Sequence, residues 1–116
     1  MPLIKVQTSI ANPDQEKVKD LLKNLSNKLA KHLGKPESYV MTIFESDLPM
    51  SFACTFDPVC YLEIKSVGTM SSSQTKTMSE DFCNIIDDNL GVSKNRIYIE
   101  FADAKGYLWG WNGSTF

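Results

Sequence analysis

The sequence has few residues of the kinds that build metal sites, disulfide frameworks or membrane spans. Its 116 residues contain three cysteines and one histidine and no Cys-x-x-Cys pair, so we expect no metal, no cofactor-binding cluster and no fully paired set of disulfides. No apolar run reaches the roughly 18 residues of a membrane span, and Lys5 and Gln7 interrupt any apolar segment of a signal peptide. Twelve Lys and Arg against fourteen Asp and Glu give a net charge of −2, which argues against a nucleic-acid-binding protein. These absences predict a cytoplasmic protein with reduced thiols.

What the sequence does contain is typical of one globular domain over residues 1–116. Apolar residues make up 42% and charged residues 22%, a balance that argues against disorder. A chain of this length buries about two-thirds of its unfolded surface, which is enough for a single core.

The first half has the pattern of a strand, a helix and a second strand. Apolar residues alternate along 3–10, and residues 39–45 are rich in strand-forming types. Between them Asn12 is the expected N-cap, Pro13 the first helical residue and Gly34 the stop. Apolar residues at steps of three and four form one helical stripe: Val18, Leu21, Leu22, Leu25, Leu29 and Leu33.

The same plan returns in the second half of the chain. Its elements are expected at 59–66 (strand), 71–90 (helix) and 96–102 (strand). With an offset of 57 residues, Leu33-Gly34 aligns with Leu90-Gly91, and the two helical stripes have the same phase. We therefore predict an α+β fold of two β-α-β units, approximately 1–57 and 58–116, forming one four-stranded mixed sheet with both helices on one face.

Such a sheet leaves its other face uncovered. Apolar residues are expected on both faces of two strands: Val40, Ile43 and Phe44 in one, and Ile97, Ile99 and Phe101 in the other. An exposed apolar sheet predicts association with further copies of the chain. The aromatic segment from Tyr107 to Trp111 is expected to add an edge strand.

Pro2 is the first candidate for chemistry. The initiator methionine is usually removed before a residue as small as proline, which would leave a free secondary amine. Such an amine acts as a base at neutral pH when burial or a nearby cation lowers its pKa below the usual value of about 7.7–8.0. The alternative is that Pro2 has no catalytic role, since a single residue is a weak motif.

Lys35 and the segment Ser66-Val67-Gly68 are candidates for binding a ligand. Lys35 follows Gly34 at a helix end, where a cation is also favourable for purely structural reasons. Gly68 permits a tight turn whose N–H groups face an anionic oxygen, and an ordinary strand-to-helix turn explains it equally well.

Several aromatic residues have two interpretations. Tyr98 lies in a predicted strand, where an aromatic residue is ordinary. Near the C terminus Tyr107, Trp109, Trp111 and Phe116 form a cluster, for which packing on a neighbouring subunit is favoured over a free binding surface.

Six short motifs occur in order over the whole chain: Met1-Pro2, Gly34-Lys35-Pro36, Tyr39-Val40-Met41, Ser66-Val67-Gly68, Arg96-Ile97-Tyr98-Ile99 and Trp111-Asn112-Gly113-Ser114-Thr115-Phe116. Together they resemble the macrophage migration inhibitory factor family of the tautomerase superfamily. The resemblance implies a homotrimer in which three four-stranded sheets form a barrel with six helices outside. It also implies an isomerase that needs no cofactor.

The resemblance implies a role for each candidate residue. Pro2 would be the general base in keto–enol tautomerisation of small aromatic α-keto acids such as phenylpyruvate, and of dopachrome-like compounds. Lys35 would pair with the substrate and lower the pKa of Pro2, and the backbone N–H of Val67 would donate to the substrate. Tyr98 would reach the site from the adjacent subunit. Three further residues would form its apolar wall: Trp109, Trp111 and Phe116.

Two departures from the family pattern bear on function. Glu100 stands where several relatives have an asparagine that contacts substrate, and a carboxylate there would repel acidic substrates or offset Lys35. Val59 and Leu62 replace the Cys-x-x-Cys pair of animal members, so we expect no thiol–disulfide oxidoreductase activity.

The resemblance leaves a second class of function open. Animal relatives act as cytokines, so the alternative is a signalling protein that binds a cell-surface receptor, leaves the cell without a signal peptide and retains only secondary or vestigial catalysis. A ferredoxin-like nucleic-acid binder would share the order of elements, but the first strand carries no stacking aromatic residue and the chain is acidic.

Overall fold

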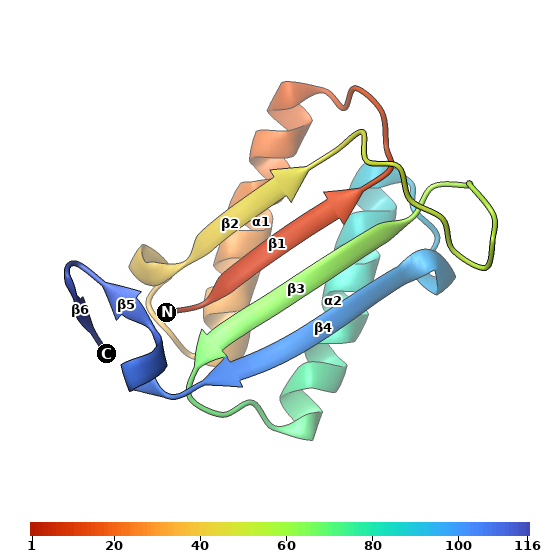
Figure 1. The fold of residues 1–116 in the computed structure, drawn as a ribbon. Coiled ribbons are helices and arrows are strands. Elements are labelled where there is room, and N and C mark those ends of the chain that lie inside the picture. Colours follow the sequence, from red (N-terminus) through yellow and green to blue (C-terminus); the bar gives the residue numbers. More distant parts are fainter.

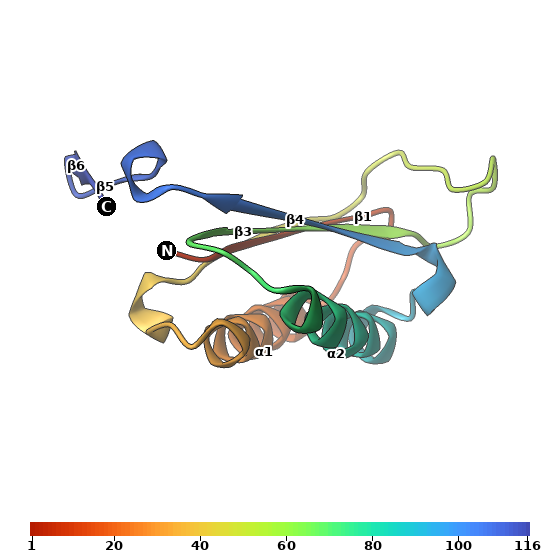
Figure 2. The same ribbon diagram turned by 90° about the horizontal axis from the view of Figure 1, so that it is seen from below.

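The computed structural model describes all of residues 1–116. A four-stranded sheet with two helices on one face makes up most of the molecule (Figures 1 and 2). The elements of this layer pair are β1 (Leu3–Thr8), α1 (Gln15–Leu33), β2 (Met41–Glu45), β3 (Cys60–Val67), α2 (Ser72–Leu90) and β4 (Ile97–Ala104). Three single turns of 3-10 helix connect them to their neighbours: η1 (Glu37–Tyr39), η2 (Lys94–Arg96) and η3 (Gly106–Leu108). None of the helices combines the length and the apolar character that crossing a membrane demands.

The strand order is β2-β1-β3-β4. β1 runs parallel to β2, and β3 runs parallel to β4, so each half of the chain forms a parallel β-α-β unit. The two units meet through the antiparallel pair β1 and β3, in which Leu3 lies opposite Lys65 and Thr8 opposite Cys60. The predicted α+β architecture, with a mixed sheet and both helices on one face, is confirmed.

The core lies between the sheet and the two helices because every second strand residue points toward them. Its fully buried members come from β1, β3 and both helical stripes: Ile4, Val6, Leu62, Ile64, Leu21, Leu25, Leu29, Met78, Phe82 and Ile86. The helices are also joined by a polar contact, in which Nε2 of His32 lies 2.6 Å from Oδ2 of Asp81.

The start of α1 differs from the prediction. Asp14 is the N-cap, its carboxylate accepting the N–H of Glu16, and Pro13 lies outside the helix. Asn12 instead has a φ of 46° and donates its N–H to the Asp47 carboxylate, so it serves the preceding loop. Asn12 and Asp14 both have side chains of a type that caps helices. Asn12 belongs to the loop contact with Asp47, and Asp14 is the residue that caps α1.

The C-terminal segment differs as well. It does not add an edge strand to the main sheet but forms a separate two-stranded hairpin of β5 (Gly110–Trp111) and β6 (Ser114–Thr115). The hairpin lies beyond the end of β4, on the same side of the molecule as the N terminus (Figure 1).

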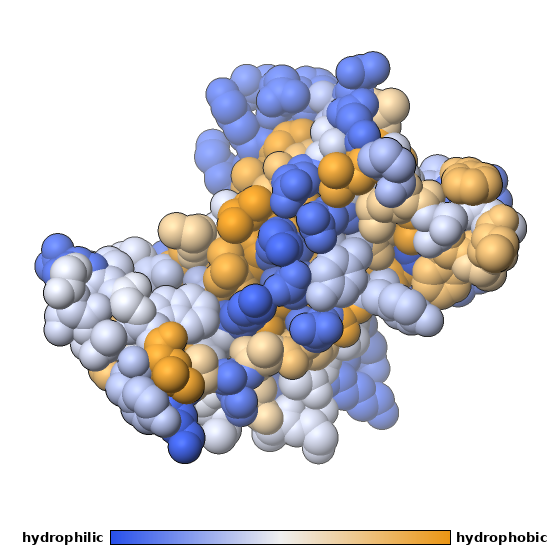
Figure 3. Space-filling model, viewed as in Figure 1, coloured by the Kyte–Doolittle hydropathy of each residue, from blue (hydrophilic) through white to orange (hydrophobic).

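The uncovered face of the sheet is polar along its middle, which corrects the expectation of apolar residues on both faces of β4. Ile97, Ile99 and Phe101 all pack toward the helical core, because they share one strand parity. The row across the open face is Ile43, Lys5, Glu63 and Glu100. Hydrophilic side chains run along this face in Figure 3.

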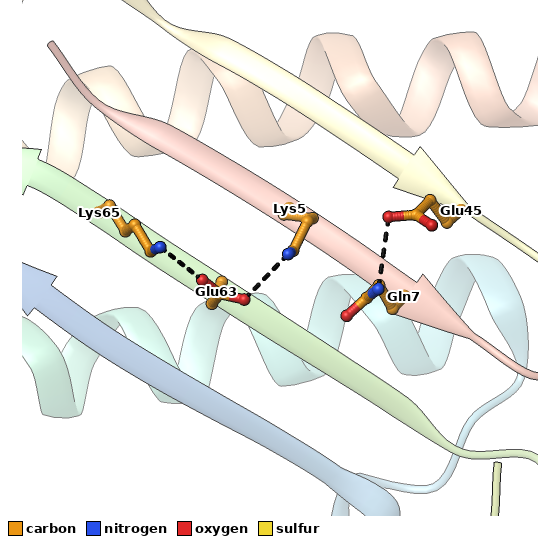
Figure 4. A network of polar contacts seen from close by, with 5 residues as sticks. All are labelled: Lys5, Gln7, Glu45, Glu63 and Lys65. Atoms are coloured by element: carbon orange, nitrogen blue, oxygen red, sulfur yellow. Dashed lines mark hydrogen bonds and ion pairs between the residues drawn. The ribbon is translucent and has the colours of Figure 1, made fainter. Parts of the chain in front are cut away.

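Ion pairs organise this open face (Figure 4). Glu63 accepts from Lys65 at 2.9 Å and from Lys5 at 3.1 Å, and Gln7 donates to Glu45 at 3.3 Å. Hydrogen bonds from Lys65 and then Lys5 hold the pKa of Glu63 below its usual value. The open face is therefore mixed, since the apolar side chains of Met41, which is 61% exposed, and Ile43 lie on it beside the ion pairs.

The packing of α1 gives a direct test of this core. Replacing the fully buried Leu25 by alanine should lower the free energy of unfolding by about 2–5 kcal/mol, since it removes apolar contacts and leaves a cavity. Urea denaturation followed by circular dichroism measures the loss. The exposed neighbour Lys23→Ala should change it by less than about 0.5 kcal/mol, and an equal effect of the two variants would contradict the assigned core.

Candidate active site at the N terminus

Pro2 is buried where the chain enters the sheet. Its carbonyl accepts the N–H of Met41 at 3.0 Å, which ties it to the first residue of β2. Antiparallel pairing brings the start of β1 beside the end of β3, since Leu3 lies opposite Lys65. Residues that follow α1 and residues that end β3 therefore converge on the same end of the sheet.

Lys35 enters this region from the end of α1. Gly34 closes the helix in the left-handed conformation with φ of 63°, and the N–H of Lys35 still bonds to the carbonyl of Ala30 at 3.0 Å. This turn directs the Lys35 side chain to the end of β3, where Nζ donates to the carbonyl of Val67 at 2.8 Å. The structure thus brings Lys35 and Val67 together, with contact at the Val67 carbonyl.

Gly68 follows Val67 in a backbone conformation that favours glycine. Its φ of 94° is one that residues with a side chain rarely adopt, and a Cβ there would lie 3.8 Å from Lys35 Nζ. Its N–H bonds to the carbonyl of Ala104 at 2.9 Å, which anchors the turn to the end of β4. A further pocket of about 480 Å³ opens beside Val67 and Gly68, against residues 103–108.

The N-terminal amine lies in an electrostatic environment that favours its neutral form. The pKa of the Met1 amino group is lowered below its usual value, first by burial and then by the positive charge of Lys35. Both causes act on the ammonium form only, so an amine in this position keeps its lone pair available at lower pH than an exposed one.

An aromatic pocket of about 200 Å³ adjoins this amine. Its lining comes from Met1, from η1 and the start of β2, and from the C-terminal hairpin: Ser38, Tyr39, Val40, Met41, Trp109, Trp111 and Phe116. The rings of Tyr39 and Trp111 make an edge-to-face contact with 5.3 Å between their centroids. The ring of Phe116 stacks on that of Trp111, with 5.6 Å between centroids. Met1 connects the two parts of the site, since its amine is near Lys35 and the residue lines the pocket.

The hairpin is held in place by the backbone of Phe116. Its N–H lies 3.2 Å from the carbonyls of both Gly106 and Trp109. A side chain at Gly106 would collide with the Phe116 carbonyl, so glycine is needed for this closure. The position of the Phe116 ring therefore depends on tight backbone contacts that no sequence periodicity indicates.

Tyr98 and Glu100 lie apart from the other predicted site residues. Tyr98 is in register with Tyr61, which pairs with Gln7, five positions along β1 from Pro2. That separation is roughly 16 Å at about 3.3 Å per residue, before the distance across two strands is added. A single chain therefore cannot bring Tyr98 to Pro2. Glu100 faces the open side of the sheet next to Glu63.

Sequence reasoning missed Tyr39 as a pocket residue. The sequence patterns place it at the start of a strand and in a family motif, whereas it ends the turn η1 and presents its ring to the hairpin. An aromatic residue four positions after Lys35 is a signal that could have suggested it. No group of three or more His, Cys, Asp or Glu side chains is arranged to hold a metal ion.

Comparison with known proteins identifies the relatives of this chain. The family model described as macrophage migration inhibitory factor matches residues 1–116. The macrophage migration inhibitory factor of Meriones unguiculatus is 34% identical, covering 100% of this chain and 99% of that protein, and a homologue from Brugia malayi is 36% identical with the same coverage. Among solved structures, the homologue from Prochlorococcus marinus superposes with a TM-score of 0.91 at 48% identity, covering 98% of each chain.

The electrostatic role assigned to Lys35 can be measured. Lys35→Met should raise the pKa of the N-terminal amine toward its ordinary value, because a positive charge that disfavours the ammonium is removed. The pH dependence of amine acylation, followed by mass spectrometry of the N-terminal peptide, reports this pKa. Lys31→Met removes the same charge from an exposed position on α1 and serves as the control. An equal rise in both variants would show that net charge, and not the location of Lys35, is responsible.

Proposed function

The chain belongs to the macrophage migration inhibitory factor family, and from this membership we propose that it is a cofactor-free keto–enol tautomerase with Pro2 as its general base. The observation that supports the proposal most directly is the Met1 amine, one residue before Pro2, whose pKa is lowered by burial and by Lys35 and which lies beside an aromatic pocket. Proton abstraction next to a carbonyl needs a base that is neutral near the working pH.

The base in this proposal forms when Met1 is removed. The new terminus is the secondary amine of Pro2, a buried residue fixed by its bond to the N–H of Met41. Loss of Met1 also removes one of the residues that line the aromatic pocket, so the same event exposes the base and enlarges the space next to it.

The reaction moves one proton between carbon and oxygen. The Pro2 nitrogen takes a proton from the carbon next to the substrate carbonyl, and the electron pair of that C–H bond becomes the enolate, with negative charge on oxygen. Lys35 lies where its ammonium stabilises that oxygen or the substrate carboxylate, and the end of β3 at Val67 lines the same position. The protonated amine then returns its proton to the oxygen, so atoms and charge balance without an oxidant.

The pocket favours an aromatic substrate. Tyr39, Trp109, Trp111 and Phe116 supply ring faces and edges that suit a planar apolar group, while Lys35 suits a carboxylate. Small aromatic α-keto acids such as phenylpyruvate have both parts, and dopachrome-like compounds are a further candidate class. Glu100 would lower the affinity for an acid if it faced the site, since like charges repel.

The active form in this proposal is a homotrimer. Tyr98 stands too far along the sheet to meet Pro2 of its own chain, so a site that contains both residues requires a second copy. β2 and β4 are the two open edges of the sheet through which copies can meet. The homologues of known structure support the subunit fold on which this assembly is based.

A cytokine-like role is the second candidate. It is supported by the name macrophage migration inhibitory factor that the animal relatives carry. In that case the chain would bind a cell-surface receptor through surfaces that do not depend on the lone pair of Pro2.

Replacement of Pro2 by glycine tests the base. With Met1 shown to be absent by intact mass, Pro2→Gly should lower kcat/KM for phenylpyruvate tautomerisation by about 10²-fold or more, the usual contribution of a general base. In the wild type the rate should fall as pH drops through the pKa of the amine, because only the neutral amine accepts a proton. Equal rates in wild type and variant would sink the proline mechanism. No activity in either would favour the receptor-binding role.

Trp109 tests the substrate class. Trp109→Val should raise the KM for phenylpyruvate about tenfold while leaving kcat within about twofold, since it removes apolar contact that ground state and transition state share. Pyruvate, which lacks the ring, is the control substrate and should show little change in KM. A similar rise for both substrates would mean that the residue supports the hairpin and not the aromatic ring.

A further inference from the structure

The connection between β2 and β3 is a long loop, residues 46–59, that projects past the end of the sheet (Figures 1 and 2). It ends beside η2, the turn that precedes β4. Arg96, the last residue of η2, lies two positions before Tyr98. The loop and Tyr98 therefore meet at the same corner of the molecule.

Arg96 holds this loop through five hydrogen bonds. Nε donates to the carbonyl of Pro58 at 2.9 Å, and Nη2 donates to the carbonyls of Asp57 at 2.9 Å and Thr55 at 3.3 Å. Nη1 donates to the hydroxyl of Thr55 at 2.7 Å and to the carbonyl of Phe52 at 3.3 Å. A guanidinium has five N–H donors in a planar arrangement, whereas a lysine ammonium has three at one point and cannot reproduce this set.

The tip of the loop is a strained turn that needs such support. Ala53 and Cys54 have φ values of 51° and 56°, in the left-handed region that residues other than glycine rarely adopt. Two hydrogen bonds between Phe52 and Thr55 close the turn, at 3.1 and 2.9 Å. Strained conformations persist where the surroundings determine them, and Arg96 contacts both residues that flank this turn.

Phe52 connects the clamped loop to Tyr98. The Arg96 guanidinium carbon lies 5.5 Å from the centre of the Phe52 ring, a cation–π contact. The same ring meets Tyr98 at 5.0 Å between centroids with an interplanar angle of 62°, an edge-to-face contact. Tyr98 is 66% exposed, so this is the principal aromatic contact that restrains its ring within the chain.

We propose that Arg96 and Phe52 are positioning residues for Tyr98: the clamped loop places the Phe52 ring, and that ring holds Tyr98 in the orientation with which it enters the neighbouring subunit's site. The inference rests on the proposed function, in which Tyr98 completes the site of another copy. Restraint of an exposed ring before it meets substrate lowers the cost of ordering it on binding.

The test combines kinetics with a signal from Tyr98 itself. Phe52→Leu removes the ring and should raise the KM for phenylpyruvate about tenfold with kcat within about twofold, while Phe52→Tyr keeps the ring and should restore the wild-type KM. Phe56→Leu, in the same loop and 82% exposed, is the matched control and should leave KM unchanged. In a Tyr98→Ala background, Phe52→Leu should have no additional effect, because the residue it positions is gone.

NMR of ¹³C-labelled tyrosine gives a measurement that does not depend on activity. The chain has four tyrosines, so the Tyr98 ring signal can be assigned from its loss in Tyr98→Phe. This signal should move in Arg96→Lys, which keeps the Phe52 ring and its ring-current effect, and stay in place in Phe56→Leu. If the wild type is active and neither the KM nor the Tyr98 signal changes in these variants, the positioning role alone is overturned. An inactive wild type would overturn the proposed function, and the Tyr98 signal in Arg96→Lys would still decide whether the clamped loop orients that ring.

Discussion

The antiparallel pairing of β1 with β3 is the constraint on which the rest of the structure depends. It joins two parallel β-α-β units into one sheet and leaves both helices on the same face. Because the two units run in opposite directions, the beginning of one lies beside the end of the other. The entry to β1, with Pro2, therefore meets the end of β3, with Val67. The same pairing sends the start of β4, with Tyr98, to the opposite end of the sheet.

Lys35 lies where a structural contact and an electrostatic effect come from the same side chain. As a cation just past the end of α1, it suits the negative end of the helix dipole. Because Gly34 turns the chain back, the Lys35 ammonium also reaches the Val67 carbonyl. Burial first, and then this positive charge, lowers the pKa of the Met1 amine. The geometry that suits Lys35 to the helix end is thus compatible with the role that the proposed function gives it, and neither interpretation excludes the other.

The polar face of the sheet changes the argument for assembly. An apolar open face would have favoured association by burial, but Lys5, Glu63 and Lys65 form ion pairs there. The reason for proposing an assembly is instead geometric, since Tyr98 and Pro2 of one chain are too far apart to act together. At the Tyr98 end, Phe52 of the loop held by Arg96 contacts a ring that its own sheet leaves exposed.

The sequence by itself determined the elements and their order. Leucines at helical spacing, glycines in left-handed positions after each helix, and alternating strands are local patterns, and they predicted two β-α-β units correctly. The family motifs likewise indicated Pro2, Lys35 and Val67 as residues of one site. The prediction that Ile97, Ile99 and Phe101 give β4 two apolar faces was wrong, because residues two positions apart in a strand lie on the same face. The predicted N-cap of α1, Asn12, was also wrong: Asn12 contacts Asp47, and Asp14 caps the helix.

Only the tertiary structure decided which distant residues meet. The pocket formed by Tyr39 and the C-terminal hairpin, the contact of Lys35 with the Val67 carbonyl, and the five bonds from Arg96 to the loop all join segments separated by tens of residues. Such contacts depend on strand register and on backbone turns with positive φ, which a one-dimensional pattern does not encode. The sequence therefore identified the groups that carry charge and aromatic surface, and the register of β1 on β3 decided which of them share a site.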